Sequence, residues 1–205
     1  MIELFVFDLG KVILPFEHRQ IASKLWQRCR NKGRLPESAI FDDLFDMENG
    51  AINRYEEGLS SSEEFFLDIR KRYDLAVEFE EFSEIWNNIF WDNPEVDKVL
   101  VYLKSKGYPL FLLSNTNELH FSYVIERFPI VHLFDEWILS FEVGAKKPAK
   151  RMYDAIFEKT DVDRAHVLYI DDIDAYVQAA RSYGIPGLVY TSPEDLWHVL
   201  RQYGI

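Results

Sequence analysis

Residues 2–13 read IELFVFDLGKVI, and this stretch decides the fold. An apolar, β-prone run leads to the carboxylate of Asp8, and Gly10 follows two residues later. Near-continuous apolar strands are typical of parallel sheets that are covered on both faces. Ligands of open α/β sheets bind at the carboxyl ends of such strands. We therefore expect Asp8 to act as a nucleophile, as a metal ligand, or as both.

Beyond Asn93-Pro94, short apolar strands alternate with amphipathic helices. Strands are expected at residues 109–113, 137–139, 167–170 and 187–190. Helices are expected at about residues 95–106, 118–127, 149–159, 175–183 and 193–203, and a loop at 142–148. Such alternation with short connections predicts an α/β fold, a Rossmann-like doubly wound parallel sheet.

The stretch between these two parts is helical in its pattern. Helical periodicity covers about residues 16–31, 36–48, 61–73 and 79–90, and one of Ser60, Ser61 and Ser62 can cap the third helix. We expect an α/β core of residues 1–15 and 94–205 and an all-helical insertion of residues 16–93, with hinges near 15–17 and 93–94. The aromatic side chains that we expect mainly in the core of this insertion are Trp26, Phe41, Phe45, Phe65, Phe66, Trp86, Phe90 and Trp91.

Composition excludes several classes of protein. The 205 residues are 48% hydrophobic, which is enough for a packed core, and their net charge of −12 argues against a nucleic-acid partner. Cys29 is the only cysteine, so no intrachain disulfide can form, and we expect a cytoplasmic location. No apolar run approaches the roughly 18 residues of a membrane span, so no membrane partner is expected. Glu3 and the lack of a basic leading segment argue against a signal peptide. The oligomeric state stays open.

Polar groups follow three of the expected strands and one loop. They are Asp8, Ser114, Asn115, Asp171, Asp172 and the pair Lys146-Lys147. The carboxyl ends of parallel strands share one edge of the sheet, so these groups can converge there. Carboxylates such as Asp8 and Asp172 suit Mg²⁺, and Ser114 with a lysine suits the oxygens of a phosphoryl group. The pattern is typical of a phosphoryl-transfer site.

The order and spacing of these groups resemble those of haloacid dehalogenase-like (HAD) hydrolases. The matching motifs are FVFDLGKV at 5–12, LLSNT at 112–116, KP at 147–148 and YIDD at 169–172. The helical insertion between the first two motifs resembles the C1 cap of that family. The resemblance covers nearly the whole chain, and four motifs in order are far more specific than any one of them.

By this resemblance, Asp8 is the nucleophile and a Mg²⁺ ligand. The backbone carbonyl of Gly10 and the carboxylate of Asp172 complete the protein ligands, and Asp171 lies beside the metal or is bridged to it by water. The resemblance assigns the phosphate to Ser114, Asn115 and Lys147.

Gly10 departs from the family pattern, which has a second Asp there. One branch that tolerates Gly includes bacterial sugar-phosphate phosphatases, among them an α-D-glucose-1-phosphate phosphatase. We therefore expect a Mg²⁺-dependent phosphatase that hydrolyses a small phosphomonoester, a sugar phosphate in particular, through an aspartyl-phosphate on Asp8. Because glycine cannot move a proton, hydrolysis should be slower where the leaving group must be protonated.

Three other functions stay open. A 2-haloacid dehalogenase also forms an ester on Asp, but it needs no metal and leaves Asp171-Asp172 without a purpose. A phosphomutase needs the proton shuttle that Gly10 lacks. A catalytically weak, phosphate-binding HAD-like protein is the third possibility.

Several residues near these motifs can also be interpreted without a functional role. Lys146 competes with Lys147, although Pro148 makes Lys147 the better motif match. For Lys11, a side chain that points to solvent is at least as good an interpretation as a contact with substrate. Tyr176 stands where the family often has Asn. His18 and His120 are interpreted as packing or surface histidines.

Overall fold

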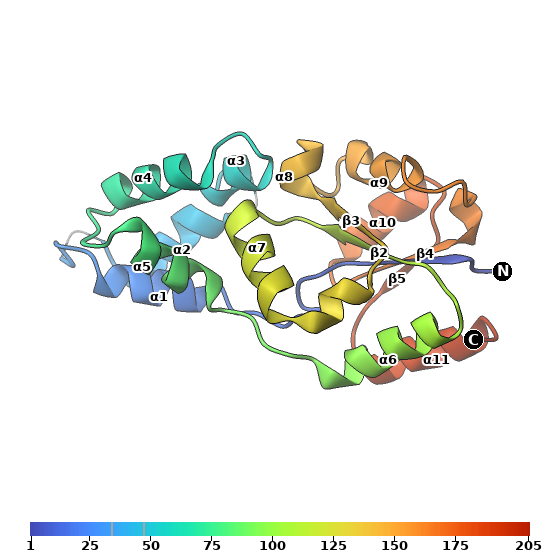
Figure 1. Cartoon of the computed structure of the whole chain (residues 1–205). Helices are drawn as coiled ribbons and strands as arrows, with labels where there is room; N and C mark the ends of the chain where they lie inside the picture. Colours follow the sequence, from blue (N-terminus) through green and yellow to red (C-terminus); the bar gives the residue numbers. More distant parts are fainter. Residues whose placement is uncertain (34, 47) are drawn as a thin grey trace.

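The computed structural model describes residues 1–33, 35–46 and 48–205. Its centre is a five-stranded parallel sheet in the order β3-β2-β1-β4-β5 (Figure 1). The strands are β1 (Leu4–Phe7), β2 (Leu110–Ser114), β3 (Glu136–Leu139), β4 (Val167–Asp171) and β5 (Gly187–Val189). Strand order reverses beside β1, because β2 lies on one side of it and β4 on the other. The predicted doubly wound α/β fold is confirmed.

Helices cover both faces of this sheet. They are α6 (Pro94–Ser105), α7 (Glu118–Arg127), α9 (Lys150–Phe157), α10 (Asp174–Ser182) and α11 (Pro193–Gln202). Alternate side chains of β1 explain the two layers: Phe5 and Phe7 pack with α6, α7 and α11, whereas Leu4 and Val6 pack with α9 and α10. None of the helices in the described part of the chain is long and apolar enough to cross a membrane.

The insertion has its own helices and its own core (Figure 1). They are α1 (Arg19–Gln27), α2 (Glu37–Phe45), α3 (Ile52–Glu56), α4 (Ser62–Arg72) and α5 (Phe79–Asn87). Ser61 and Glu64 form a capping box at the start of α4, as the serine cluster predicts. The helix expected at 36–48 ends at Phe45, and Met47 lies outside the described residues. Most of the expected aromatic residues pack in or against this core. The prediction is wrong for Trp91, whose side chain is 47% exposed.

The two linkers between core and insertion run side by side. Phe16 and Phe90 form an antiparallel bridge, Trp91 N donates to Pro15 O (3.1 Å), and Asn93 Nδ2 donates to Val12 O (3.1 Å). The pairing supports the boundaries at 15/16 and 93/94, which stay a prediction.

The insertion is docked on the carboxyl ends of the strands. Ser62 Oγ donates to Glu118 Oε2 (2.5 Å), and Leu119 N donates to Tyr55 OH (3.1 Å). Gly58, with φ +68°, lies so close that a Cβ there would be 2.1 Å from the carbonyl oxygen of Phe141.

Short elements account for most of the structure that the sequence did not predict. α3 (Ile52–Glu56) and α8 (Ser140–Val143) contact each other where the insertion meets the core. The expected loop at 142–148 is wrong at its start, since Glu142 and Val143 belong to α8. Two 3₁₀ turns, η1 (Pro129–Leu133) and η2 (Arg164–His166), complete the fold.

Candidate active site

The expected site residues meet at one edge of the sheet. Asp8 directly follows β1, Ser114 ends β2 and Asp171 ends β4. Phe7 is in register with Ile170, and Asp8 N donates to Ile170 O (2.8 Å), so Asp8 and Asp171 come from adjacent positions. Asp8 borders a cavity of about 250 Å³. Its lining residues are Asp8, Gly10, Lys11, Phe16, His18, Glu56, Asn115, Lys146, Lys147, Asp172, Ile173 and Tyr176.

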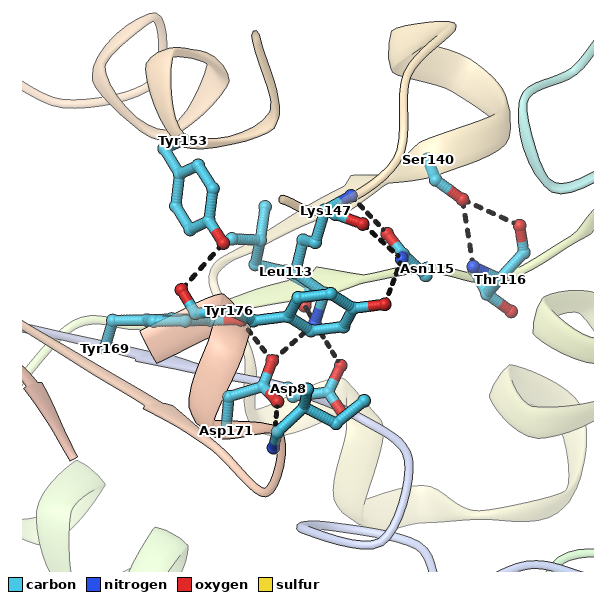
Figure 2. A network of polar contacts seen from close by, with 11 residues as sticks. Asp8, Leu113, Asn115, Thr116, Ser140, Lys147, Tyr153, Tyr169, Asp171 and Tyr176 are labelled. Atoms are coloured by element: carbon cyan, nitrogen blue, oxygen red, sulfur yellow. Dashed lines mark hydrogen bonds and ion pairs between the residues drawn. The ribbon is translucent and has the colours of Figure 1, made fainter. Parts of the chain in front are cut away.

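Lys147 lies at the centre of this arrangement (Figure 2). Its side chain is 1% exposed, and its Nζ donates to Asp8 Oδ1 (2.6 Å), Asp171 Oδ2 (2.8 Å) and Leu113 O (3.0 Å). Those bonds use all three donors of the ammonium group. Burial alone would lower the pKa of Lys147, but the charges of Asp8 and Asp171 outweigh it and raise that pKa above its ordinary value. The ammonium therefore stays charged and holds the two carboxylates together.

Both carboxylate oxygens of Asp171 accept hydrogen bonds from the protein. Its Oδ2 accepts from Lys147 and from the hydroxyl of Tyr169, and its Oδ1 accepts from Ile173 N (2.8 Å) (Figure 2). Asp171 thus positions Lys147 and the turn after β4. Tyr169 was not among the predicted site residues, because within a buried strand it has the pattern of a core residue.

Asn115 faces the cavity, but its amide is engaged by the Lys147 loop. Its Oδ1 accepts from Lys147 N (2.7 Å), and its Nδ2 donates to Lys147 O (3.1 Å) and to Tyr176 OH (3.4 Å) (Figure 2). Ser114 is buried and is not among the described residues that line the cavity. The contact of Ser114 and Asn115 with phosphate stays a prediction.

The carboxylates crowd one another. One oxygen each of Asp8, Asp171 and Asp172 lies within 4.8 Å of the others. Burial, opposed by Lys147 and aided by Asp171, raises the pKa of Asp8 to about 7. Burial and the charge of Asp171 also raise the pKa of Asp172. With all three ionised and Lys147 protonated, the cluster keeps an excess negative charge.

Some oxygens of this cluster face no protein donor. Within the described ranges, no residue donates a hydrogen bond to Asp8 Oδ2, to the carboxylate of Asp172 or to the carbonyl of Gly10. All three residues border the cavity. Unpaired oxygens with a surplus of negative charge are the donor set that Mg²⁺ prefers, so the residues fit the expected metal.

Phe16 occupies the space beside Gly10. A Cβ on Gly10 would lie 2.5 Å from Cε1 of Phe16, so any side chain there requires the ring to move. The Nζ of Lys11 lies 5.6 Å from the centre of the same ring, and Lys11 is exposed while bordering the cavity. The gap left by the missing second acid is thus filled by an aromatic ring.

The two adjacent lysines have different partners. Lys147 reaches Asp8, whereas Lys146 Nζ lies 2.6 Å from Glu56 Oε2 and donates to Asn53 Oδ1 (2.5 Å) on the insertion. The preference for Lys147 over Lys146 agrees with this geometry. Glu56 belongs to no motif, and its position at the end of an unpredicted short helix is why the sequence did not single it out.

Comparison with known proteins decides the family. A family model described as haloacid dehalogenase-like hydrolase matches residues 44–189, more than half of the chain. The chain belongs to this family. The membership expected from the four motifs is confirmed. Asp8 precedes the matched residues, so the roles expected for Asp8, Lys147 and Asp171 stay predictions.

Two relatives of this HAD-like hydrolase are named as phosphatases. It is 27% identical over 192 residues to a D-ribitol-5-phosphate phosphatase of Bacteroides thetaiotaomicron, covering 90% of this chain and 89% of that one. It is 27% identical over 106 residues to a phosphorylated carbohydrates phosphatase of Thermotoga maritima, covering 52% and 49%. The crystal structure of a HAD family enzyme from Bacteroides thetaiotaomicron, in complex with magnesium and inorganic phosphate, has a TM-score of 0.85 at 23% identity and covers 98% and 99%. The two named phosphatases agree with the expected activity, and the crystal structure shows the same fold.

Proposed function

We propose that this HAD-like hydrolase is a Mg²⁺-dependent phosphatase, which hydrolyses a small phosphorylated sugar or polyol through an aspartyl-phosphate on Asp8. The observation that carries the proposal is the buried Lys147, which binds Asp8 Oδ1 at 2.6 Å and leaves Asp8 Oδ2 and Asp172 at the cavity. The named activity of the D-ribitol-5-phosphate phosphatase, which aligns over 90% of the chain, supports the substrate class.

Asp8, the carbonyl of Gly10 and Asp172 would hold the Mg²⁺ ion. When bound, the ion supplies positive charge that offsets the carboxylates and attracts a phosphoryl group. Asp171 is placed beside the metal rather than among its ligands in this proposal, because its Oδ2 holds Lys147 and Tyr169 and its Oδ1 accepts from Ile173 N.

Asp8 carries the covalent chemistry. Its carboxylate attacks phosphorus, the bond from phosphorus to the substrate alcohol breaks, and the phosphoryl group stays on Asp8. Water then attacks the phosphoryl group and releases inorganic phosphate with the regenerated carboxylate. Lys147 fixes the orientation of Asp8 throughout, and a proton for the leaving alcohol has to come from water or another group, because Gly10 has none to give.

The size of the cavity favours a small substrate. Its volume of about 250 Å³ is below the roughly 300–1,000 Å³ of sites for drug-sized ligands. Gly58 and Phe141 are in close contact where the insertion meets the core. A free metabolite therefore fits the site better than a phosphorylated protein.

The charge of the acidic cluster argues against one of the alternative functions, the 2-haloacid dehalogenase. A dehalogenase acts on an anionic acid without a metal, and the excess negative charge of the Asp8, Asp171 and Asp172 cluster would then repel that substrate. A protein that only binds phosphate is distinguished by turnover.

The proposal is tested by phosphate release from D-ribitol 5-phosphate and a panel of sugar phosphates. We expect turnover with Mg²⁺, loss of turnover with EDTA, and recovery when excess Mg²⁺ is added. Chloride release from a 2-haloacid that is insensitive to EDTA would replace the proposal with a dehalogenase. Mg²⁺ binding without turnover above background would favour a protein that binds phosphate compounds without hydrolysing them.

Acid should weaken Mg²⁺ binding. The pKa of Asp8 in the metal-free protein is raised to about 7, and only the ionised carboxylate is a ligand. We expect the apparent Kd to rise by about tenfold for each pH unit below 7 and to level off above it. Isothermal titration calorimetry between pH 5.5 and 8 measures this, and an unchanged Kd over that range would show that Asp8 does not bind the ion.

A further inference from the structure

His18 is a cavity residue whose hydrogen-bonding groups the phosphatase chemistry leaves unused. It precedes α1 in the linker that leads from the first strand to the insertion, and it lines the cavity together with Asp8 and Lys147. Its ring is stacked on the ring of Phe45, with centroids 4.2 Å apart, and its centroid lies 4.5 Å from that of Phe16. Within the described ranges, neither imidazole nitrogen has a hydrogen-bond partner.

His120 shows what a purely structural histidine looks like in this fold. Its ring stacks with Trp86, but its Nδ1 lies 3.1 Å from Asn117 Nδ2 and its Nε2 lies 3.0 Å from Trp86 O. Both nitrogens are thus satisfied by the protein, and His120 does not border the cavity. His18 shares the aromatic packing and lacks the partners.

The imidazole of His18 is neutral. Burial, followed by the charges of His120 and Lys11, lowers the pKa of His18 to about 3. A neutral imidazole offers one donor and one acceptor. A hydroxyl group offers the same combination, so the imidazole can donate a hydrogen bond to it or accept one from it.

Other polar groups around the cavity are engaged or charged. Lys146 is paired with Glu56, and the amide of Asn115 is bonded to the Lys147 loop. Lys11 is an exposed cation, which suits the phosphate or solvent. Position 10, where a HAD-like hydrolase with a second Asp would contact the leaving group, has no side chain and is covered by Phe16.

We propose that His18 is a specificity-determining residue, which hydrogen-bonds a hydroxyl group of the alcohol portion of the phosphorylated sugar or polyol. The inference rests on the proposed phosphatase function and adds to it how the enzyme recognises the part of the substrate beyond the phosphate.

The test compares two primary phosphate esters with five carbon atoms each. D-ribitol 5-phosphate carries hydroxyl groups, and n-pentyl phosphate carries none, so the ratio of their kcat/KM values reports hydroxyl recognition. His18→Phe keeps an aromatic ring against Phe45 and removes both nitrogens. We expect this variant to lower the ratio by about tenfold, the effect of losing one good hydrogen bond to substrate, and His18→Gln or His18→Asn to retain part of it.

Phe45→Leu is the matched control. It disturbs the stack and keeps the imidazole, so the ratio should stay at the wild-type value, and melting temperatures of all variants report on folding. An unchanged ratio in His18→Phe, or an equal loss in Phe45→Leu, would show that His18 only packs. Wild-type enzyme that hydrolyses neither ester with Mg²⁺ would overturn the phosphatase function itself, which is a separate outcome from an insensitive ratio.

Discussion

Replacing Asp8 by Asn is expected to reduce phosphate release from D-ribitol 5-phosphate by roughly 10³-fold or more, since loss of a nucleophile leaves only binding effects. The amide has nearly the shape of the carboxylate and its oxygen can still accept from Lys147, which binds Asp8 Oδ1 at 2.6 Å. An amide cannot form the acyl-phosphate, so the chemistry fails while the geometry is kept. Single-turnover phosphate release with saturating Mg²⁺ measures the loss directly.

A second acidic residue near the site provides the control. Asp174 begins α10, is exposed, and accepts from Gln178 at 3.0 Å. Asp174→Asn should stay within about twofold of the wild-type rate, because exposed residues outside the site have small effects. The melting temperature of Asp8→Asn at pH 8 should not be lower than that of the wild type, because the change removes a buried charge. Retention of more than a tenth of the activity by a folded Asp8→Asn variant would remove Asp8 from the nucleophile role.

The sheet and the convergence at its edge could be predicted because they depend on local patterns with a known spatial consequence. β1, β2 and β4 are apolar runs that are buried at every position, which is typical of central parallel strands. Parallel strands place their carboxyl ends together, so Asp8 and Asp171 had to meet. Lys147 is positioned by a long-range contact with Asp8, so the sequence indicated only the pair Lys146-Lys147, and the family resemblance chose Lys147.

What could not be predicted depends on packing between segments far apart in the sequence. α3 and α8 have 5 and 4 residues, too few for a helical period to stand out from the flanking loops. Glu56 therefore had no expected neighbour, although it pairs with Lys146 across the interface.

Gly10 shows how a correct observation can have an incomplete explanation. From the sequence it is a missing proton donor, and this stays a prediction. The structure adds that the ring of Phe16 would lie 2.5 Å from any Cβ at position 10. Restoring the family pattern by Gly10→Asp alone would thus force two groups into one space. The linker that carries Phe16 also carries His18, and both rings border the cavity beside Gly10.

Replacing Lys147 by Met is expected to abolish phosphate release and to lower the free energy of unfolding at pH 8 by about 3–5 kcal/mol, the usual cost of leaving a buried charge without its partner. Lys147 is 1% exposed and joins Asp8 to Asp171 at 2.6 and 2.8 Å. Met fills a similar volume but supplies no charge and no donor, so both carboxylates face each other in a buried space. Urea unfolding of the metal-free protein measures the change.

The loss should be smaller at pH 5 than at pH 8. Asp8 already has a pKa that is raised to about 7 by burial and by Asp171, against an ordinary value of 3.8. A carboxyl whose pKa is higher in the folded state binds its proton more tightly there, so its folded form loses stability as the pH rises through the interval between the two values. Without Lys147 this interval widens upward, and protonation at pH 5 relieves the repulsion that is fully present at pH 8.

Lys150→Met is the matched control. Lys150 pairs with Asp154 at 2.7 Å on the exposed side of α9, and its side chain is 59% exposed. Exposed ion pairs of this kind contribute about 0–1 kcal/mol, so the change should cost little at either pH. A Lys147→Met variant that is as stable as Lys150→Met at pH 8 would mean that water reaches the carboxylates freely. Burial, which we give as the cause of both the raised pKa of Asp8 and its fixed orientation, would then be excluded.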